Sequence, residues 1–337
     1  MIEEITLADY TTMRVGGPAR MTRAGTTEEL IDAVRGADND GHAVLLVGGG
    51  SNLVISDAGF DGQVVLMGND GVAVSAQDDS VLLEVQAGAD WDELVQRSVA
   101  EGWAGIECLS GIPGRVGATP VQNVGAYGAE IADVLTSVEV WDRTAGQRRT
   151  LSAVECGFGY RSSIFKHSHE RVVLSVQLRL TRSAQSAPVR YAELARSLGV
   201  QVGERVALAD ARDAVLELRR SKGMVLDPTD HDTWSAGSFF TNPILAPQAV
   251  PAGAPAYDAG EGLAKTSAAW LIEHAGFGKG FGNDRAALSS KHTLALTNRG
   301  GASTEDILAL AREIRDGVRG RFAIELRPEP LLIGCAL

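Results

Sequence analysis

The sequence is poor in cysteine and in aromatic residues, and it has no long apolar run. Its 337 residues include 3 cysteines, Cys108, Cys156 and Cys335, and 5% aromatic residues. Three widely separated cysteines with no C-x-x-C spacing make neither a disulfide framework nor a recognisable metal site. We therefore expect reduced, packed thiols and no bound metal.

No stretch approaches the roughly 18 consecutive apolar residues of a membrane span. The first residues, MIEEITLADYTTMRVGG, lack the basic start and apolar stretch of a secretory signal. A cytoplasmic location is the expectation that follows.

Basic residues are also fewer than acidic ones. Lys and Arg number 31 against 43 Asp and Glu, a formal charge of −12. Such a balance argues against nonspecific binding to nucleic acid or to a membrane surface, since both need a basic field. An anionic ligand must therefore meet locally placed Arg and Lys. With 45% hydrophobic residues the chain can bury a sizeable core, in two or three domains.

Glycine, by contrast, is abundant and unevenly placed. The run from Ser110 to Gly128, SGIPGRVGATPVQNVGAYG, holds too many small residues to pack a core. Glycine lets a ligand approach the main chain, and Pro113 and Pro120 stiffen the path. The run predicts a binding loop for a large, flat or anionic ligand; an ordinary surface loop is the alternative.

A second glycine-rich segment follows a short apolar run at Val44–Val47. In VLLVGGGSNLVIS, a buried strand is expected to end at Gly48, Gly49 and Gly50, where free N–H groups form an anion-binding concavity. The string is not a Walker loop, because no GK[ST] follows, and Leu53 breaks the Rossmann glycine spacing. Two such loops predict one dinucleotide held in a non-Rossmann manner.

The pattern along the chain indicates mixed α and β structure. Residues 1–70 predict a small βαβ unit, with Thr26 and Glu29 as a capping box. Strand patterns dominate residues 71–180, with a helix at 90–102, and further helices are expected at 191–199, 209–222, 265–276 and 303–322. A short strand is expected at 292–298, and a last strand at 323–333.

Three further places offer reactive groups, and each has a structural alternative. In GFGYRSSIFK, Arg161 beside Lys166 could clamp a carboxylate or be a surface guanidinium. In SAGSFFTNP, the Ser238 hydroxyl could enter a pocket or cap a turn. In ELRPEPLLIG, Glu329 between two prolines could be a fixed acid or a salt-bridge partner.

Taken together these strings resemble one family, the UDP-N-acetylenolpyruvoylglucosamine reductases, also called UDP-N-acetylmuramate dehydrogenases. The resemblance covers essentially the whole chain. It rests on TTMRVGGPA, VGGGSNLV, AGADWDELV, the run 110–128, GYRSSIFK, AGSFFTNP, AAWLIEHAG and the terminal L-x-P-E, in that order.

The resemblance implies an α+β protein: an FAD-binding domain of the vanillyl-alcohol oxidase type, built from two α/β subdomains, and a separate α/β substrate-binding domain. The implied ranges are 1–70 and 71–205 for the subdomains, 206–322 for the substrate-binding domain, and 323–337 for a closing strand carrying a catalytic Glu. It also implies non-covalent FAD, with NADPH as hydride donor. The implied reaction reduces UDP-N-acetylglucosamine enolpyruvate to UDP-N-acetylmuramate in peptidoglycan precursor synthesis, with no obligate protein partner.

The resemblance also assigns residues. Arg161 and Glu329 match the positions that bind and polarise the substrate carboxylate, and Ser238 matches the proton donor. Substrate contacts are implied for Tyr160, Tyr191, Lys222, Gly237 and Asn242, with Tyr191 in the extended segment 187–199 placing the chain in the branch with a tyrosine-bearing loop. Cofactor contacts are implied for Gly48, Gly49, Gly50, Ser51, Asn52, Gly111, Ile112, Pro113, Gly114, Gly117, Ala118, Gln122, Asn123, Gly125 and Ala126. Lys291 and His292 are left outside the expected site, because the KHTLAL string does not follow the family pattern.

Two other classes remain as alternatives. A flavin-dependent oxidase of the same fold would use oxygen and an alcohol substrate; the absence of a His for flavin attachment and the presence of Arg161, Ser238 and Glu329 count against it. A non-catalytic nucleotide-binding module would be expected to lack at least one of Arg161, Ser238 and Glu329.

Overall fold

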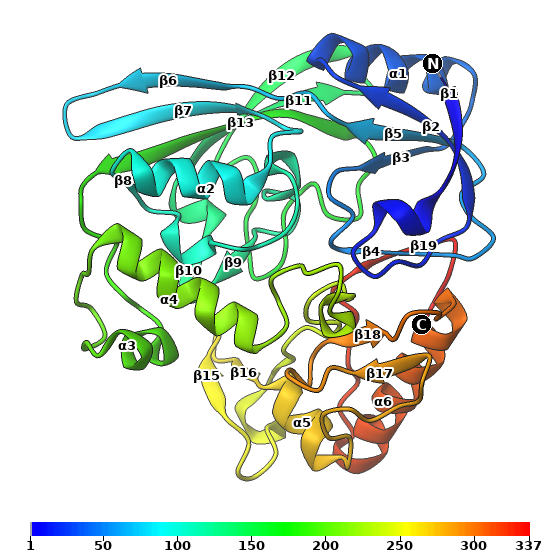
Figure 1. Ribbon diagram of the computed structural model, residues 1–337, viewed down its shortest axis with the longest axis vertical. Helices are drawn as coiled ribbons and strands as arrows, with labels where there is room; N and C mark the ends of the chain where they lie inside the picture. Colours follow the sequence, from blue (N-terminus) through cyan, green and yellow to red (C-terminus); the bar gives the residue numbers. More distant parts are fainter. Residues whose placement is uncertain (1) are drawn as a thin grey trace. The chain divides into compact units, whose positions relative to one another are not determined.

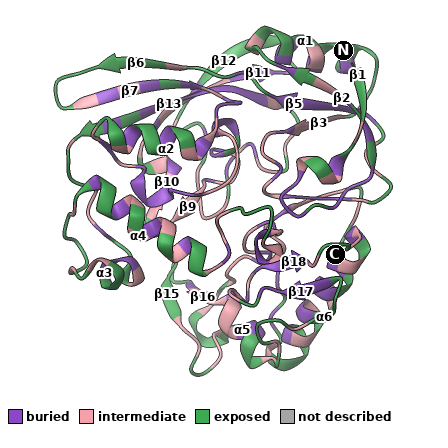
Figure 2. Ribbon diagram, viewed as in Figure 1, coloured by how far each residue is buried: buried purple, intermediate pink, exposed green. Residues whose placement is uncertain are grey.

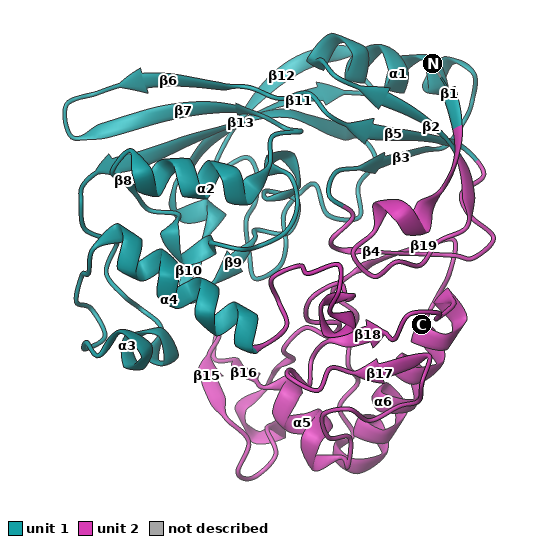
Figure 3. Cartoon of the chain, viewed as in Figure 1, with its two compact units in different colours: residues 1–3, 20–49, 62–221 teal, residues 4–19, 50–61, 222–337 magenta. Residues whose placement is uncertain are grey.

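The computed structural model describes residues 2–337, which form two compact units (Figures 1 and 3). Unit 1 comprises residues 1–3, 20–49 and 62–221, and unit 2 comprises residues 4–19, 50–61 and 222–337. Unit 2 is thus assembled from three separate stretches of chain. The boundary near residue 222 places the helix at 208–221 in unit 1, and the finer division expected from the sequence stays a prediction.

Unit 1 begins with the expected βαβ arrangement. Its first sheet has the order β1-β2-β5-β3, with β2 and β3 both parallel to β5, which lies between them. The strands are β1 (Ile2–Thr6), β2 (Pro18–Ala24), β5 (Gln63–Met67) and β3 (Val44–Val47). Helix α1 (Thr27–Asn39) packs on β3 and β5 through its buried apolar face.

The second sheet of unit 1 is antiparallel, with the order β12-β11-β13-β7-β6 and β8 paired to β13. Its strands are β12 (Gln147–Ser152), β11 (Leu135–Asp142), β13 (Arg171–Arg182), β7 (Ser80–Gln86), β6 (Val72–Ala76) and β8 (Trp103–Ala104). Buried residues of β7, β11 and β13 form the core of the unit (Figure 2). A small hairpin joins β9 (Gly125–Ala126) to β10 (Ala129–Glu130) inside the glycine-rich run.

The remaining helices of unit 1 are α2 (Trp91–Ala100), α3 (Ala192–Leu198) and α4 (Leu208–Ser221), which α2 and α3 both contact. Two helix starts follow from local side chains. Asp90 caps α2 by accepting from the Glu93 N–H, and Thr26 caps α1 by accepting from the Glu29 N–H. The expected capping box at Thr26 is only half formed, because the Glu29 carboxylate accepts from the N–H of Gly25 instead.

Unit 2 packs two helices against small sheets. Its helices are α5 (Ala268–His274) and α6 (Thr304–Phe322). Its strands are β4 (Leu53–Ile55), β14 (Ile244–Leu245), β15 (Ala256–Asp258), β16 (Ala264–Thr266), β17 (Ala286–Leu288), β18 (Leu296–Asn298) and β19 (Leu331–Ile333). The Asp57 carboxylate accepts from the Thr304 N–H at 2.9 Å, which ties the N-terminal stretch to the start of α6.

Short 3-10 helices complete the two units. They are η1 (Leu7–Tyr10), η2 (Glu107–Leu109), η3 (Val116–Ala118), η4 (Ile131–Asp133), η5 (His231–Thr233) and η6 (Pro247–Ala249).

Two expected strands are shorter than the sequence pattern indicated. The strand expected at 292–298 covers only Leu296–Asn298, and the terminal strand expected at 323–333 covers only Leu331–Ile333. Pro328 and Pro330 lack an N–H, and residues 327–329 pair instead with residues 239–241 through an isolated antiparallel bridge at Phe240 and Pro328, so the ladder with β4 begins only at Leu331. Glu329 therefore precedes the closing strand β19, which pairs in parallel with β4.

The cysteines are free thiols, as expected. Cys108 and Cys156 are buried and Cys335 is partly buried. Burial raises the pKa of Cys108 to about 12 and that of Cys156 to about 11. Among the residues described, no helix is long and apolar enough to cross a membrane.

The burial of the thiols predicts their reactivity. In the native protein at pH 8 we expect a thiol reagent such as dithionitrobenzoate to modify Cys335 first, with Cys108 and Cys156 reacting only on unfolding, because the thiolate is the reactive form. The absorbance of the coloured thiolate released by the reagent measures how many cysteines have reacted and how fast. Rapid modification of two or more thiols in the folded protein would contradict the packing described.

Candidate active site

The two glycine-rich runs meet in unit 1. A Cβ placed on Gly49 would lie 2.7 Å from the Gly114 Cα, and one on Gly48 would lie 3.2 Å from the Arg115 Cγ. Since real Cβ atoms do not approach so closely, the first position must be glycine for the two loops to touch. Gly111 and Gly114 have φ values of 70° and 137°, which also favour glycine.

The turn after β3 presents unpaired backbone donors. Among residues 2–337, none accepts a hydrogen bond from the N–H groups of Gly49, Gly50 or Ser51. Gly50 has a φ of 60°, and a Cβ there would lie 1.9 Å from the Tyr10 carbonyl oxygen. Consecutive free N–H groups on such a turn suit phosphate oxygens. The residues present therefore fit the pyrophosphate of a dinucleotide.

Some residues expected at the cofactor have structural partners instead. The Gly111 N–H donates to the Asp92 carboxylate at 2.6 Å, and the Gly117 N–H donates to the Ala87 carbonyl at 2.8 Å. The Ala118 N–H donates to Arg115, and Ile112 packs against the core of unit 1. These residues shape the loop, while their N–H groups or side chains are engaged within it.

Arg161 lies beside the end of the glycine-rich run. Its guanidinium Nη2 donates to the Gly125 carbonyl at 2.7 Å and its Cζ lies 5.5 Å from the centre of the Tyr160 ring. The Lys166 ammonium donates to the Arg161 carbonyl at 3.0 Å. The guanidinium is thus held in place rather than free on the surface.

The backbone around this arginine is strained. Arg161, Asn123 and Tyr127 have φ values of 51°, 46° and 50°, a region that side-chain-bearing residues rarely adopt. The Asn123 amide donates to the Gly159 carbonyl at 3.2 Å, which joins the two strained segments. Such outliers collect at functional sites, where surrounding contacts hold them.

Tyr191 stands at the start of α3 and is 46% exposed. Its ring meets the buried Tyr127 ring edge to face, with centroids 5.7 Å apart. Burial raises the pKa of Tyr127 to about 12, so its hydroxyl stays protonated. The tyrosine of the 187–199 segment is therefore placed over the glycine-rich run of the same unit.

Ser238 and Glu329 are neighbours in unit 2. The Glu329 N–H donates to the Phe239 carbonyl at 2.8 Å, and the Thr241 N–H donates to the Arg327 carbonyl at 3.0 Å. The Phe239 and Phe240 rings are fully buried and fix this pairing. Chain segments some ninety residues apart in sequence thus place the serine beside the glutamate.

The Ser238 side chain does not cap a turn. Within residues 2–337 its hydroxyl has no hydrogen-bond partner, whereas the Ser235 hydroxyl accepts from the Gly237 N–H at 3.2 Å. Gly237 has a φ of 72°, so glycine is favoured immediately before the serine. The structural alternative for Ser238 is therefore unsupported, and that role belongs to Ser235.

Asn52, in the second glycine-rich segment, contacts the chain at Glu329 and Leu331. Its carbonyl accepts from the Leu331 N–H at 2.9 Å, and its amide nitrogen lies 3.5 Å from the Glu329 carbonyl. Asn242 has a different task, because its side-chain oxygen accepts from the Ala268 N–H at the start of α5. The side-chain oxygen of Asn242, a residue expected to contact the substrate, is therefore engaged in a hydrogen bond within the protein.

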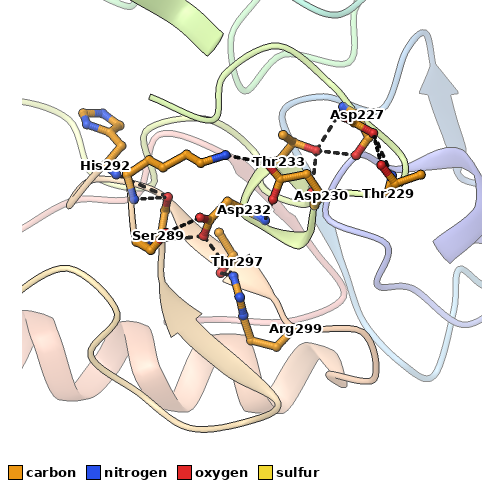
Figure 4. Close-up of polar contacts among 11 residues, drawn as sticks. Asp227, Thr229, Asp230, Asp232, Thr233, Ser289, His292, Thr297 and Arg299 are labelled. Carbon is orange, nitrogen blue, oxygen red and sulfur yellow. Dashed lines mark hydrogen bonds and ion pairs between the residues drawn. The ribbon is translucent and has the colours of Figure 1, made fainter. Parts of the chain in front are cut away.

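The sequence did not indicate a polar network that precedes Ser238 (Figure 4). Asp232, 5% exposed, accepts from the Ser290 N–H and hydroxyl and from the Arg299 guanidinium. Although burial raises its pKa, Ser290 and Arg299 together lower the pKa below the ordinary value. The Lys291 ammonium pairs with the Asp230 carboxylate at 2.5 Å. This network fixes the chain six residues before Ser238. The sequence does not indicate it, because Ser290 and Arg299 lie 58 and 67 residues from Asp232.

Comparison with known proteins gives a consistent picture. An FAD binding domain model matches residues 18–152, and a model of the UDP-N-acetylenolpyruvoylglucosamine reductase C-terminal domain matches residues 227–333. A reductase of that name from Thermobifida fusca is 56% identical over 99% of this chain and 98% of its own length, and one from Cutibacterium acnes is 52% identical over 99% and 91%. The crystal structure of UDP-N-acetylenolpyruvylglucosamine reductase from Thermus caldophilus covers 99% of both chains at 27% identity, with a TM-score of 0.71.

The fold and the paired glycine loops define an FAD-dependent oxidoreductase. The chain belongs to the UDP-N-acetylenolpyruvoylglucosamine reductase family. The expected α+β class, with an FAD-binding domain and a separate second domain, is confirmed.

The contact between Gly49 and Gly114 predicts how an alanine at position 49 would affect FAD binding. Gly49→Ala should weaken FAD binding strongly, because the added Cβ forces the two loops apart. Gly36→Ala is the matched control: Gly36 lies within α1 with nothing within 4 Å of an added Cβ, and it should raise stability by about 0.5–1 kcal/mol. Titration of apoprotein with FAD, followed by flavin fluorescence, measures the affinity. Unchanged affinity in Gly49→Ala would contradict a cofactor role for this loop contact.

Proposed function

We propose that this chain reduces the enolpyruvyl ether of UDP-N-acetylglucosamine enolpyruvate to the lactyl ether of UDP-N-acetylmuramate, a step of peptidoglycan precursor synthesis, with NADPH as hydride donor. The names of its full-length relatives and the pairing of an FAD-binding domain with the reductase C-terminal domain support this reaction. The observation that carries it is the hydroxyl of Ser238, unpartnered in residues 2–337, on a chain segment whose backbone pairs with that of Glu329.

The reaction sets clear demands on the protein. Bound FAD supplies hydride chemistry, and it is held without a covalent bond, since neither glycine-rich run carries a His or Cys in place for attachment. Addition of a hydride to the terminal vinyl carbon leaves negative charge on the α-carbon and the adjacent carboxylate. The site therefore needs fixed donors or cations at the carboxylate and an acid at the α-carbon.

Arg161 is the cation that we assign to the carboxylate, together with Glu329 as its polarising partner. The hydrogen bond from Nη2 to the Gly125 carbonyl helps to fix the orientation of the guanidinium plane. A guanidinium held in this way binds a carboxylate in two parallel hydrogen bonds with little further loss of entropy.

Ser238 is the group that we assign as proton donor to the α-carbon. A serine hydroxyl is a weak acid, so it transfers a proton only to a strongly basic carbon held close to it. The pairing of residues 239–241 with 327–329 and the buried Phe239 hold its backbone rigid. The carbanion-like transition state supplies the basicity.

The nucleotide part of the substrate requires further contacts. We assign these to Tyr160, Tyr191, Lys222, Gly237 and Asn242, with the Tyr191 loop covering the substrate. The edge-to-face contact with Tyr127 supports this role for Tyr191. We also propose that the enzyme works in the cytoplasm, where NADPH is available, without an obligate protein partner.

Replacement of Ser238 tests the proposed chemistry. In Ser238→Ala, flavin reduction by NADPH should stay near normal, because that step needs no proton from this side chain. Reoxidation by the enolpyruvyl substrate should slow by about two to four powers of ten. Anaerobic stopped-flow absorbance of the flavin follows each half-reaction separately.

Ser235→Ala is the matched control for this experiment, since it removes the neighbouring turn bond to Gly237 and leaves Ser238 intact. It should change both half-reactions only slightly. Equal slowing of both half-reactions in Ser238→Ala, or of neither, rules out the serine as proton donor.

A further inference from the structure

Residues 87–92, which connect β7 to α2, run beside the glycine-rich loop at 109–117. The Gly117 and Val116 N–H groups donate to the Ala87 and Ala89 carbonyls at 2.8 and 2.9 Å. The Trp91 N–H donates to the Gly114 carbonyl at 3.1 Å, and its ring Nε1 donates to the Leu109 carbonyl at 3.0 Å. This connection, the AGADWDELV motif of the sequence, is thus the frame on which the loop is built.

Asp92 forms the last contact of the frame and links it to a second element. One of its carboxylate oxygens accepts the Gly111 N–H at 2.6 Å. The carboxylate also forms a two-bond pair with the Arg212 guanidinium of α4, at 2.7 and 2.8 Å. The Arg212 side chain is 12% exposed and that of Asp92 34% exposed, so water screens the pair only in part.

This arrangement places a carboxylate directly behind an expected phosphate loop. A negative charge there repels an anionic cofactor unless a cation cancels it. Arg212 supplies that cation at hydrogen-bond distance. Although burial raises the pKa of Asp92, the bonds from Arg212 and Gly111 lower it, so the carboxylate is ionised at neutral pH.

We propose that Asp92 is a positioning residue for FAD. It holds Gly111 in its left-handed conformation through the N–H, and Arg212 cancels its charge so that an anionic cofactor can bind next to the loop. The inference rests on the proposed assignment of residues 110–118 to the FAD site. It adds two residues, from α2 and α4, to those that shape this site.

Other charged groups lie on the elements and loops around α2. Arg219 lies two turns beyond Arg212 on α4, is 8% exposed and lowers the pKa of Asp92 further. Glu107 of η2 accepts from the Gly105 and Ala187 N–H groups, and Arg115 of the loop pairs with Asp90 at 3.6 Å. Arg212 is the cation whose removal leaves the Asp92 charge without its hydrogen-bonded partner.

A set of four variants tests the proposal: Arg212→Gln, Arg212→Lys, Asp92→Asn, and Asp92→Asn combined with Arg212→Gln. The readouts are the FAD dissociation constant of the apoprotein by flavin fluorescence and its unfolding temperature. Arg212→Gln should weaken FAD binding on the order of tenfold to a hundredfold, because it exposes the loop to an uncancelled charge. Arg212→Lys should lose less.

The double variant separates charge from packing. An amide at position 92 still accepts the Gly111 N–H, and no charge remains, so its FAD affinity should return to within a few-fold of the unmodified protein. If the pair has a purely structural role, the double variant should instead bind FAD no more tightly than Arg212→Gln, because it lacks both partners of the ion pair.

The pH dependence of FAD binding provides a second arm. Without Arg212 the pKa of Asp92 rises, so protonation of this carboxylate at lower pH should restore part of the FAD affinity of Arg212→Gln relative to that of the unmodified protein measured at the same pH. Affinity within twofold of the unmodified protein in Arg212→Gln, or no recovery in the double variant, overturns the proposal.

These outcomes are distinguishable from failure of the loop assignment itself. If Gly49→Ala abolishes FAD binding while the Asp92 and Arg212 variants bind normally, the loop is the cofactor site and Asp92 has no part in it. If none of these variants changes FAD affinity, the assignment of the loop fails as well.

Discussion

The close approach of the two glycine-rich loops in unit 1 is the constraint on which the rest of the site depends. Gly49 lies against Gly114 with no room for a side chain. That contact requires the 109–117 loop to hold a fixed path, and the hydrogen bonds from residues 87–92 supply it. Several donors and acceptors of this loop are bonded to the neighbouring segment, whereas among residues 2–337 the N–H groups of Gly49, Gly50 and Ser51 have no acceptor and are available to a ligand.

In a protein with a formal charge of −12, an anionic ligand needs arginine or lysine side chains placed locally at its site. Several arginines here pair with nearby carboxylates, as Arg299 does with Asp232 and Arg212 with Asp92. Arg161 is held in part by a neutral group, because its guanidinium donates to the Gly125 carbonyl. The strained backbone at Arg161 and Asn123 is consistent with contacts that fix this guanidinium at some energetic cost.

Local patterns in the sequence predicted most helices well, because caps and apolar spacing act over a few residues. Helices α1, α2, α4 and α6 lie where Thr26, Asp90 and the periodic apolar positions placed them. The predicted length of the terminal strand was wrong. The prediction followed the apolar residues and did not take into account that Pro328 and Pro330 have no N–H to donate. The resemblance to a family supplied Arg161, Ser238 and Glu329 as candidates, and their roles stay predictions.

Long-range pairs were beyond the reach of the sequence. The Asp92 and Arg212 partners are 120 residues apart, and the Asp232 network joins residues 58 and 67 apart. No local spacing reports such pairs, because they depend on how helices and loops pack. The same limit applies to unit 2, whose three stretches are separated by whole strands and helices of unit 1.

The most direct test of the account is an anaerobic redox titration of the purified yellow protein. NADPH should bleach the bound flavin, and one equivalent of UDP-N-acetylglucosamine enolpyruvate should restore its oxidised absorbance in the absence of oxygen, whereas UDP-N-acetylglucosamine without the enolpyruvyl group should not. Flavin that stays reduced after addition of the enolpyruvyl substrate, and is reoxidised only by oxygen, would contradict the proposed function.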